Sequence, residues 1–352
     1  MADAKEFQAV PGGNAISGEN NGTGKDPLRR DNNFGETVLG LWGKYSYVMI
    51  FIAIFITFVV VSKNLTWSGI MLILRQSAVI GIIGFGMALV ILVGDIDLSV
   101  GSGLVLISGL TVMVFNHTDN LFITLLAALL MGIAAGLFNG LLVGIAKMPP
   151  FIVTLATMLI FRSLALYISD SKLYELDATK SSFSAFHYEF GNSSFLTIPI
   201  VGIMFLLLAA AIIYMCTSTK FGKKIYALGS NAKAARLAGI NTAWLKVSLF
   251  VLCGLLVGFS SFVNVAMNRS VSPATTGISF EMYAIAGIVL GGISMSGGKG
   301  HTAGIIFGTM SFTMVSRIID AFELSTTVNN TVKGVILLLA IALQMIRKRS
   351  KE

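Results

Sequence analysis

Long uncharged apolar runs are the feature that most restricts the fold of this 352-residue chain. The runs cover residues 45–62, 76–94, 98–116, 120–146, 148–169, 195–219, 247–268, 280–298, 301–320 and 326–346, and single cations interrupt three of them. About 20 apolar residues in a helix cross a hydrocarbon core of about 30 Å. Backbone groups in lipid must also pair within their own segment, which favours helices. The runs therefore predict an all-α polytopic membrane protein with eight to ten transmembrane helices, some of them interrupted by glycine.

The composition agrees with a membrane protein. Hydrophobic residues make up 55% of the chain and charged residues only 12%, whereas soluble domains carry about 25% charged residues. The net charge of +8 does not indicate a nucleic-acid partner, because the basic residues lie in short segments between the apolar runs. Cys216 and Cys253 are too few for a disulfide framework or a metal site, and we expect them to be inert core thiols.

The distribution of Lys and Arg predicts the orientation of the chain in the membrane. Segment 217–246 holds six basic residues and no acid, whereas segment 170–190 holds four acids and two lysines. Segments rich in Lys and Arg stay in the cytoplasm. With ten spans, residues 217–246 and both termini would lie on the cytosolic side, and residues 170–196 would be external.

The chain divides into three parts. Residues 1–44 are polar and rich in Gly and Asn, without apolar periodicity, and predict a disordered cytosolic tail. The tail lacks the apolar h-region of a signal peptide. Residues 45–346 form the transmembrane domain, with 217–246 as a cytosolic loop, and residues 347–352 form a basic cytosolic tail.

Motifs for known chemistry are missing from the sequence. There is no G-x-x-x-x-G-K-[ST] phosphate loop, so the chain should not hydrolyse ATP by itself. There is also no H-E-x-x-H, G-x-S-x-G or C-x-x-C motif, and the three histidines lie in separate segments. The sequence therefore predicts neither an enzyme nor a metal site.

The stretch ILVGDIDLSVGS, residues 91–102, places two acids between two apolar runs. Ionisable groups at membrane depth are costly and suggest a function. In a regular helix, Asp95 and Asp97 would point about 200° apart, so a shared proton or metal is not expected. One interpretation is a helix break, in which Gly94 ends one helix, Asp97 or Ser99 caps the next, and Gly101 permits close packing. The other interpretation is a polar wall of a substrate path, and the two are compatible.

A third acid, Glu281, and a second broken segment occur in the last third of the chain. Residues 291–301, GGISMSGGKGH, follow an apolar run and are rich in Gly and Ser. Paired Gly-interrupted segments in the two halves of a chain are typical of a transporter path. An ordinary tight turn between two spans is the alternative.

The basic segment 217–246 contains small residues at positions 232, 234, 235 and 238. This spacing predicts a short helix with one smooth face that ends at Gly239. Such a helix on the cytosolic side could dock into a cleft of a partner. The alternative is a solvated basic loop that only sets the topology.

Four motifs, in order and with matching spacing, extend the interpretation. They are GDIDLSVGS at 94–102, PFIVTLATM at 150–158, FGKKIYALGSN at 221–231 with its continuation to Asn241, and GGISMSGGKG at 291–300. With these motifs the chain resembles the membrane-spanning permease subunit of bacterial ABC importers for simple sugars, of the ribose and galactose/methyl-galactoside type. The resemblance covers about 45–346 and implies the fold of these permeases.

The resemblance also implies partners and a location. The partners would be cytosolic ABC ATPase subunits, an external or periplasmic sugar-binding protein and a second permease subunit, identical or paralogous. ATP-Mg would be bound by the ATPase, and no cofactor by this chain. The chain would be a multi-pass protein of the bacterial cytoplasmic (inner) membrane.

Two sets of residues receive roles from this comparison. The family's coupling loop, which docks on the ATPase, matches Phe221, Gly222, Lys223, Gly229, Asn231, Ala234, Ala235, Arg236 and Gly239. The translocation path or the helix break would involve Asp95, Asp97, Ser99, Gly101, Asn139, Thr154, Thr157 and Glu281.

The sequence departs from the family pattern at two positions. Asp95 stands where the family commonly has Gly, and Tyr283 stands where a second acid is common. If these positions touch the path, the sugar would differ from the usual one; the alternative is that they are neutral changes at helix ends. A separate alternative is a permease of the same superfamily that carries a nucleoside or a branched-chain amino acid. Other classes left open are a proton-coupled secondary transporter that uses Asp95 or Glu281, and an intramembrane enzyme.

Overall fold

The secondary structure of the chain is almost entirely helical. A computed structural model describes residues 33–62, 66–322, 328, 331–335, 338 and 342. The helices are α1 (Asn33–Ser62), α2 (Trp67–Ile91), α3 (Val100–Thr118), α4 (Leu121–Gly140), α5 (Pro150–Ile168), α6 (Ile200–Ser218), α7 (Lys220–Ser230), α8 (Ala232–Leu237), α9 (Thr242–Asn268), α10 (Phe280–Leu290) and α11 (Gly304–Asp320). Two π-helical segments, η1 (Leu141–Ile145) and η2 (Ser184–Gly191), and four two-residue strands, β1 (Tyr174–Glu175), β2 (Ser194–Phe195), β3 (Ile198–Pro199) and β4 (Ser270–Val271), complete the described part.

The predicted all-α membrane architecture is confirmed. Six of the described helices are long and apolar enough to cross a membrane, namely α2, α3, α4 with η1, α5, α6 and α9. Shorter apolar helices cover Tyr47–Val61 and Phe280–Leu290. Helices satisfy their own backbone hydrogen bonds, so each apolar run becomes a helix when no water is available.

Element boundaries differ from the sequence prediction at the start of the chain. Helix α1 begins at Asn33, inside the segment that was predicted to be a disordered tail of residues 1–44. Residues 33–44 (NFGETVLGLWGK) contain enough apolar residues to continue the helix that follows. Helix α2 begins at Trp67, before the start of the predicted run 76–94. The predicted tail 347–352 and most of the run 326–346 lie outside the described residues.

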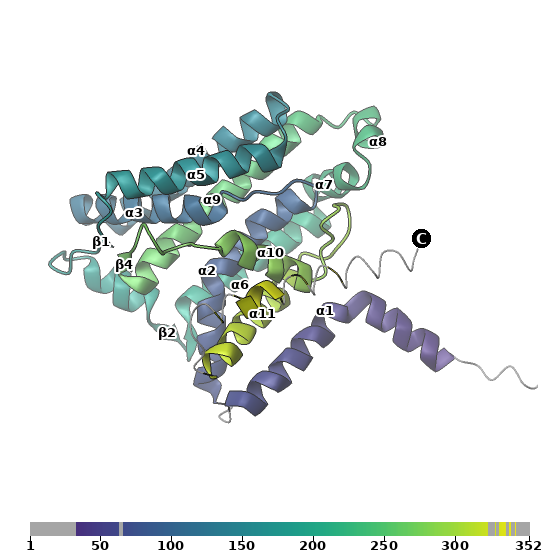
Figure 1. Cartoon of the computed structure of the whole chain (residues 1–352), viewed down its shortest axis with the longest axis horizontal. Helices are drawn as coiled ribbons and strands as arrows, with labels where there is room; N and C mark the ends of the chain where they lie inside the picture. Colours follow the sequence, from purple (N-terminus) through teal and green to yellow (C-terminus); the bar gives the residue numbers. More distant parts are fainter. Residues whose placement is uncertain are drawn as a thin grey trace, which may run out of the picture. The chain divides into compact units, whose positions relative to one another are not determined.

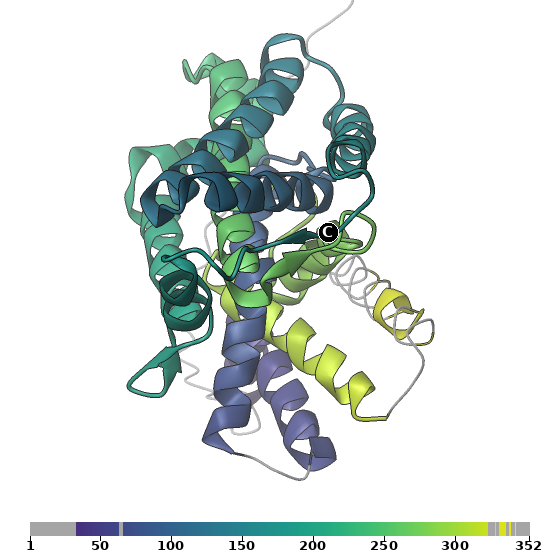
Figure 2. The same ribbon diagram turned by 90° about the vertical axis from the view of Figure 1, so that its left-hand side faces the viewer.

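The described residues from 45 onward belong to the larger of two units of the chain. Within the larger unit, α2 runs through the core, and its residues from Gly81 to Ile91 are all buried. It contacts α9, α6, α11 and α10. Figure 2 shows α11 and α10 beside α2, and Figure 1 shows α3, α4, α5 and α9 gathered together.

Helices α4 and α9 approach each other through glycines. A Cβ atom added to Gly132 would lie 2.2 Å from the carbonyl oxygen of Gly254, and one added to Gly136 would lie 2.3 Å from that of Phe250. A Cβ atom at Gly258 would likewise lie 2.4 Å from the carbonyl oxygen of Ala128. Small residues let helix backbones approach closely in membranes, where packing replaces the hydrophobic effect as the driving force. The α4–α9 pair therefore depends on the absence of side chains at these positions.

The connection between α5 and α6 is held to its neighbours by short strands and by one carboxylate. Strand β1 pairs antiparallel with β4, and β2 pairs with β3. Asp119 accepts hydrogen bonds from the backbone N–H groups of Ser181 and Ser182 and from the Ser181 hydroxyl. These bonds lower the pKa of Asp119 to about 2, with the backbone N–H of Ser182 as the largest cause. The carboxylate therefore stays ionised and anchors this loop at any physiological pH.

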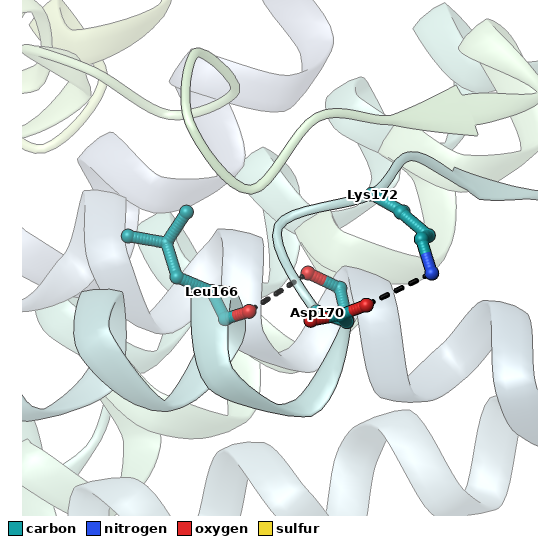
Figure 3. A network of polar contacts seen from close by, with 4 residues as sticks. Leu166, Asp170 and Lys172 are labelled. Carbon is teal, nitrogen blue, oxygen red and sulfur yellow. Dashed lines mark hydrogen bonds and ion pairs between the residues drawn. The ribbon is translucent and has the colours of Figure 1, made fainter.

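The turn that leaves α5 contains an exposed ion pair, shown in Figure 3. The Lys172 ammonium lies 2.8 Å from the Asp170 carboxylate, and both side chains are largely exposed. Exposed pairs of this kind contribute about 0–1 kcal/mol. The exposed Asp170–Lys172 pair therefore serves as a control for the effect of removing a buried ion pair.

We predict that Gly132→Ala destabilises the protein by about 1–3 kcal/mol, because the new methyl group forces α4 away from α9. Thermal unfolding in detergent micelles measures the effect. Gly84→Ala is the matched control, since its Cβ would lie 3.5 Å from Ile305 and from Thr309, an ordinary contact distance. Equal melting temperatures for the two variants would contradict close backbone packing as the basis of the α4–α9 contact.

Candidate functional site

The stretch between α2 and α3 is a helix break, as one of the two sequence interpretations expects. Gly94 has a φ of +85°, and the backbone N–H of Asp95 donates to the carbonyl of Val90 at 3.2 Å. This pattern is the glycine-terminated helix end in which a left-handed residue satisfies the last carbonyls. The glycine thus ends α2 and turns the chain into an extended segment that leads to α3.

The start of α3 differs in detail from the predicted side-chain cap. Ser99 occupies the N-cap position but its side chain accepts no N–H of the helix. Its own N–H and hydroxyl instead donate to Oδ1 of Asp97, at 2.9 and 2.6 Å. The Ser99 oxygen also accepts from the amide of Asn139 at 2.9 Å, so the hydroxyl is already occupied. Asp97 therefore shapes the turn before the helix rather than its first turn.

The proposed path residues on α4 and α5 are buried against the same break. The Thr154 hydroxyl donates to the carbonyl of Ile96 at 3.2 Å, and Asn139 contacts Ser99. Thr157 donates to carbonyls of its own helix. The three side chains of Asn139, Thr154 and Thr157 are at most 2% exposed. In this structure Asn139 and Thr154 hold the break in place, whereas Thr157 bonds within α5.

Two cavities among the described residues are too small or too apolar to hold a sugar. A cavity beside Asp97, Ser99 and Asn139 measures about 20 Å³, which is room for a single water molecule. A larger one of about 360 Å³ lies between α1 and α11, and its lining is apolar apart from Thr57. A polyhydroxylated solute needs several convergent polar groups. Neither of these two cavities is therefore an enclosed sugar site.

Asp95 is paired with Lys246, a residue at the start of α9. The ammonium lies 2.8 Å from Oδ1 and 2.7 Å from Oδ2 of the carboxylate. The Asp95 side chain is 8% exposed and the Lys246 side chain 26%. The pair connects the helix break to α9, a helix far away in the sequence. The acid that distinguishes this chain from the family pattern is therefore buried and paired with a partly exposed lysine.

The beginning of α3 lies against the segment that precedes α10. A Cβ atom at Gly101 would be 2.5 Å from the carbonyl oxygen of Gly277 and 2.4 Å from Oε2 of Glu281. The Arg162 guanidinium on α5 donates to the carbonyls of Pro273 and Thr276, at 2.9 and 2.7 Å. Its charge also acts on Glu281, which is only half-buried. Glu281 is thus the acid of this region that a solute could reach.

The second broken segment adjoins the first. The N–H of Gly298 donates to the carbonyl of Leu92, at the end of α2, with a distance of 2.8 Å. Gly297 and Gly298 have φ values of +79° and +69°. The sequence predicted two separate interruptions, and tertiary structure brings them into direct backbone contact.

The predicted short helix is present as α8, which follows a second helix, α7, that the sequence analysis did not identify (Figure 1). Asn231 caps α8 by accepting from the backbone N–H groups of Lys233 and Ala234, both at 3.0 Å. Gly239 follows the helix with a φ of +80°. Lys223, Asn231, Ala234, Arg236 and Gly239 are exposed, as a docking surface requires.

Four of the predicted coupling residues face the chain itself. Gly222 is buried, and a Cβ there would lie 2.2 Å from the carbonyl oxygen of Cys216. Ala235 is 4% exposed. Gly229 and Phe221 are half-buried, and Gly229 packs on Leu92. These residues position α7 and α8, while the exposed set of the preceding paragraph remains available to a partner.

Sequence reasoning missed several contributors to the site. Lys246 had been assigned only to topology, and Arg162 only to the interruption of an apolar run. The Asp95–Lys246 pair has one signal in the sequence, namely an acid at the end of one span and a lysine at the end of another. The contact between Gly298 and Leu92 has no such signal, since it depends on how distant turns meet.

We predict that Lys246→Met lowers the free energy of unfolding by about 3–5 kcal/mol, because it leaves the buried Asp95 carboxylate without a cation. The double variant Asp95→Leu/Lys246→Met should recover most of this loss. Denaturation in detergent measures both. The control is Lys172→Met, which removes the exposed partner of Asp170 and should change little. A double variant as unstable as the single one would contradict the pairing.

For Asp97 we predict that Asn is tolerated and Ala is not. Asparagine keeps an oxygen that can accept from the N–H and hydroxyl of Ser99, whereas alanine leaves both donors buried without an acceptor, at a cost of about 1–3 kcal/mol. Melting temperatures of the purified variants test this. Equal and severe losses for both variants would instead indicate that the negative charge itself is required.

Comparison with known proteins agrees with this arrangement. Residues 69–341 match the family described as branched-chain amino acid transport system / permease component. The chain is 37% identical to the ribose import permease protein of Bacillus subtilis (strain 168) over 305 residues, which are 85% of this chain and 92% of the relative. It is 36% identical to the ribose import permease protein of Escherichia coli (strain K12), over 76% of this chain and 83% of the relative.

A further relative is the L-arabinose transport system permease protein of Escherichia coli (strain K12), with 32% identity over 88% of this chain and 93% of the relative. No solved structure matches the chain. The family match spans α2 to α11 and includes both helix breaks as well as α7 and α8. The chain is therefore an integral membrane protein that belongs to the branched-chain amino acid transport system / permease component family.

Proposed function

We propose that this chain is the membrane-spanning permease subunit of an ATP-driven ABC importer and forms the translocation path for a monosaccharide. The observation that carries the proposal is the similarity, over most of the chain, to permease proteins named for ribose, allose and arabinose. The family description mentions branched-chain amino acids, but these relatives are named for sugars. The chain is a transport subunit and not an enzyme.

The proposed partners follow from this function. A separate ATPase subunit binds ATP-Mg and hydrolyses it, and an external binding protein delivers the sugar. A second permease, identical or paralogous, completes the path. The small size of the polar cavity beside Asp97 supports this last point, because that cavity has no room for a sugar. A path between two permeases needs only half of its wall from each.

The proposed location is the bacterial cytoplasmic membrane, with both termini in the cytosol. Segment 217–246, which includes α7 and α8, carries six basic residues and no acid. The connection between α5 and α6 carries four acids, in residues 170–190. Helix α6 joins these two regions, so they lie at its opposite ends. The positive-inside rule then places α7 and α8 in the cytosol.

In the proposed mechanism, the ATPase docks on α8 and the solute passes the broken helices. Leu237 on α8 is 90% exposed, beside the exposed Ala234 and Arg236. A solvent-exposed apolar side chain beside small residues on a helix face can bind in a cleft of a partner. Glu281, half-exposed at the start of α10, is the acid we assign to hydrogen bonding with sugar hydroxyls. ATP turnover then shifts the equilibrium between inward- and outward-facing states.

The alternative of a proton-coupled transporter is less well supported. Asp95, one of its two candidate relay residues, is held by Lys246 and faces α9 instead of a channel. A proton relay needs a group that exchanges its proton during transport. Asp95 instead attaches the helix break to α9 through its ion pair with Lys246.

Reconstitution tests the proposal. Proteoliposomes that contain the chain, its ATPase and its binding protein should take up ribose, allose or arabinose, and not leucine or uridine, only when ATP is hydrolysed. Uptake that continues with an inactive ATPase but stops when the proton gradient is dissipated would overturn the ABC mechanism. Uptake of leucine or uridine alone would overturn the sugar assignment.

For the docking surface we predict that Leu237→Glu abolishes ATP-driven uptake and binding of the ATPase, while membrane insertion is unaffected. A charged side chain cannot enter an apolar cleft without losing its hydration. The matched control is Leu196→Glu, which places the same change on an equally exposed leucine, 79% accessible, between β2 and β3. Co-purification with the ATPase distinguishes the two. Retained binding in the Leu237 variant would exclude α8 as the docking element.

A further inference from the structure

Three chain segments meet through their backbones at the end of α7. They are the end of α2 (Leu92 to Gly94), the end of α7 (Gly229 and Ser230) and the second broken segment (Gly297 and Gly298), and we call them together the glycine junction. We propose that the glycine junction makes α7 and the two broken segments move as one body, so that it is the link by which the ATPase acts on the path. This inference rests on the proposed function and adds the residues that transmit the movement.

The junction is joined by hydrogen bonds. The Gly298 N–H donates to the Leu92 carbonyl at 2.8 Å, which links the two broken segments. The Tyr226 hydroxyl on α7 donates to the carbonyl of Gly300 at 2.9 Å. The Ser230 hydroxyl, at the end of α7, donates to the carbonyl of Gly298 at 3.4 Å. Helix α7 is thus bonded directly to one broken segment, which is bonded to the other.

The contacts are too close for side chains. A Cβ atom at Gly229 would lie 1.9 Å from the carbonyl oxygen of Leu92 and 2.5 Å from the nitrogen of Gly298. One at Gly298 would lie 2.6 Å from the nitrogen of Ser230. Backbones in direct contact leave no flexible side chain between them that could absorb a displacement. Close-packed contacts of this kind transmit movement because they do not compress.

A series of contacts leads from the glycine junction along residues 95–101 to the start of α10. Asp95 is the residue after Gly94, and its pairing with Lys246 attaches the break to α9. Asp97 then orients Ser99, and Gly101 meets Gly277 and Glu281. A displacement of α7 therefore reaches the start of α10, where the accessible acid lies, through one short extended segment. Helix α8, in contrast, contacts only neighbouring α7 and α9 to any extent, which leaves its surface available to the ATPase.

The first test compares two glycine-to-alanine variants in the reconstituted complex of permease, ATPase and binding protein. Gly229→Ala should keep ATPase binding and ATP hydrolysis but reduce sugar uptake per ATP by about tenfold, a typical size for coupling between sites. Gly84→Ala is the control, a helix glycine whose added Cβ makes only ordinary contacts. Equal uptake per ATP in both variants would overturn the proposal.

Tyr226→Phe keeps the test valid if Gly229→Ala does not fold. This variant removes only the hydroxyl that donates to Gly300, and it retains the aromatic ring. It should lower uptake per ATP in the same direction and leave the melting temperature nearly unchanged. A purely structural role for this contact would lower stability and uptake together and leave the ratio of sugar to ATP intact.

The second test measures movement directly with pairs of spin labels. Cysteines introduced as Lys224→Cys and Lys299→Cys report the distance between α7 and the second broken segment, and Lys224→Cys with Lys147→Cys reports α7 against the α4–α5 connection. All three positions are exposed, while the native Cys216 and Cys253 are buried. On ATP binding the second distance should change and the first should stay constant.

The outcomes separate this inference from the proposed function. Two results would overturn the glycine junction as the link and leave the ABC mechanism intact. One is a Lys224–Lys299 distance that changes on ATP binding. The other is a constant Lys224–Lys147 distance in a complex that transports sugar. Uptake that does not depend on ATP overturns the proposed function. In that case the constant distance would still describe the rigidity of the junction but not a role in transport.

Discussion

The structure depends on one constraint, the need to pair every backbone polar group where no water is available. Intact helices meet this need by themselves, but the chain contains two interruptions that cannot. At the first, Gly94 closes α2 and Asp97 accepts the N–H of Ser99. At the second, the N–H of Gly298 donates to the carbonyl of Leu92. In the separate segment before α10, Arg162 donates to the carbonyls of Pro273 and Thr276. Some of the charged residues in this apolar sequence, such as Asp97 and Arg162, thus complete the irregular backbone.

The same constraint explains the use of glycine. Glycine supplies the left-handed conformations that end α2 and shape the turn at 297–298. It also permits backbone contact between α4 and α9, and between α7 and both breaks. Glycine, the residue with the greatest backbone freedom, thus provides the rigid backbone contacts between these helices. A transporter needs such rigid bodies as much as it needs hinges, because a movement is useful only if it reaches the path.

Much of the architecture was predictable, because apolar run length and helix length are linked by the thickness of a bilayer. The break at Gly94 and the short helix ending before Gly239 followed from local chemistry. The prediction that Asp97 or Ser99 caps α3 gave the right N-cap residue, Ser99, but its hydroxyl bonds to Asp97 and Asn139 and not to an N–H group of the helix. Among the candidate site residues, Gly229 and Ala235 were assigned to a docking face but turned inward. Local patterns indicate which residues share a helix face but not what that face meets.

The amino-acid sequence by itself determined the class of protein, the succession of membrane helices, the two interruptions and the family, since each of these depends on composition, short-range periodicity or motif order. Only the tertiary structure decided that Asp95 pairs with Lys246, and that the two interruptions and α7 share one junction. These contacts join residues more than a hundred positions apart in some cases, such as 95 and 246. They arise from the way that helices pack, which no local pattern in the chain encodes.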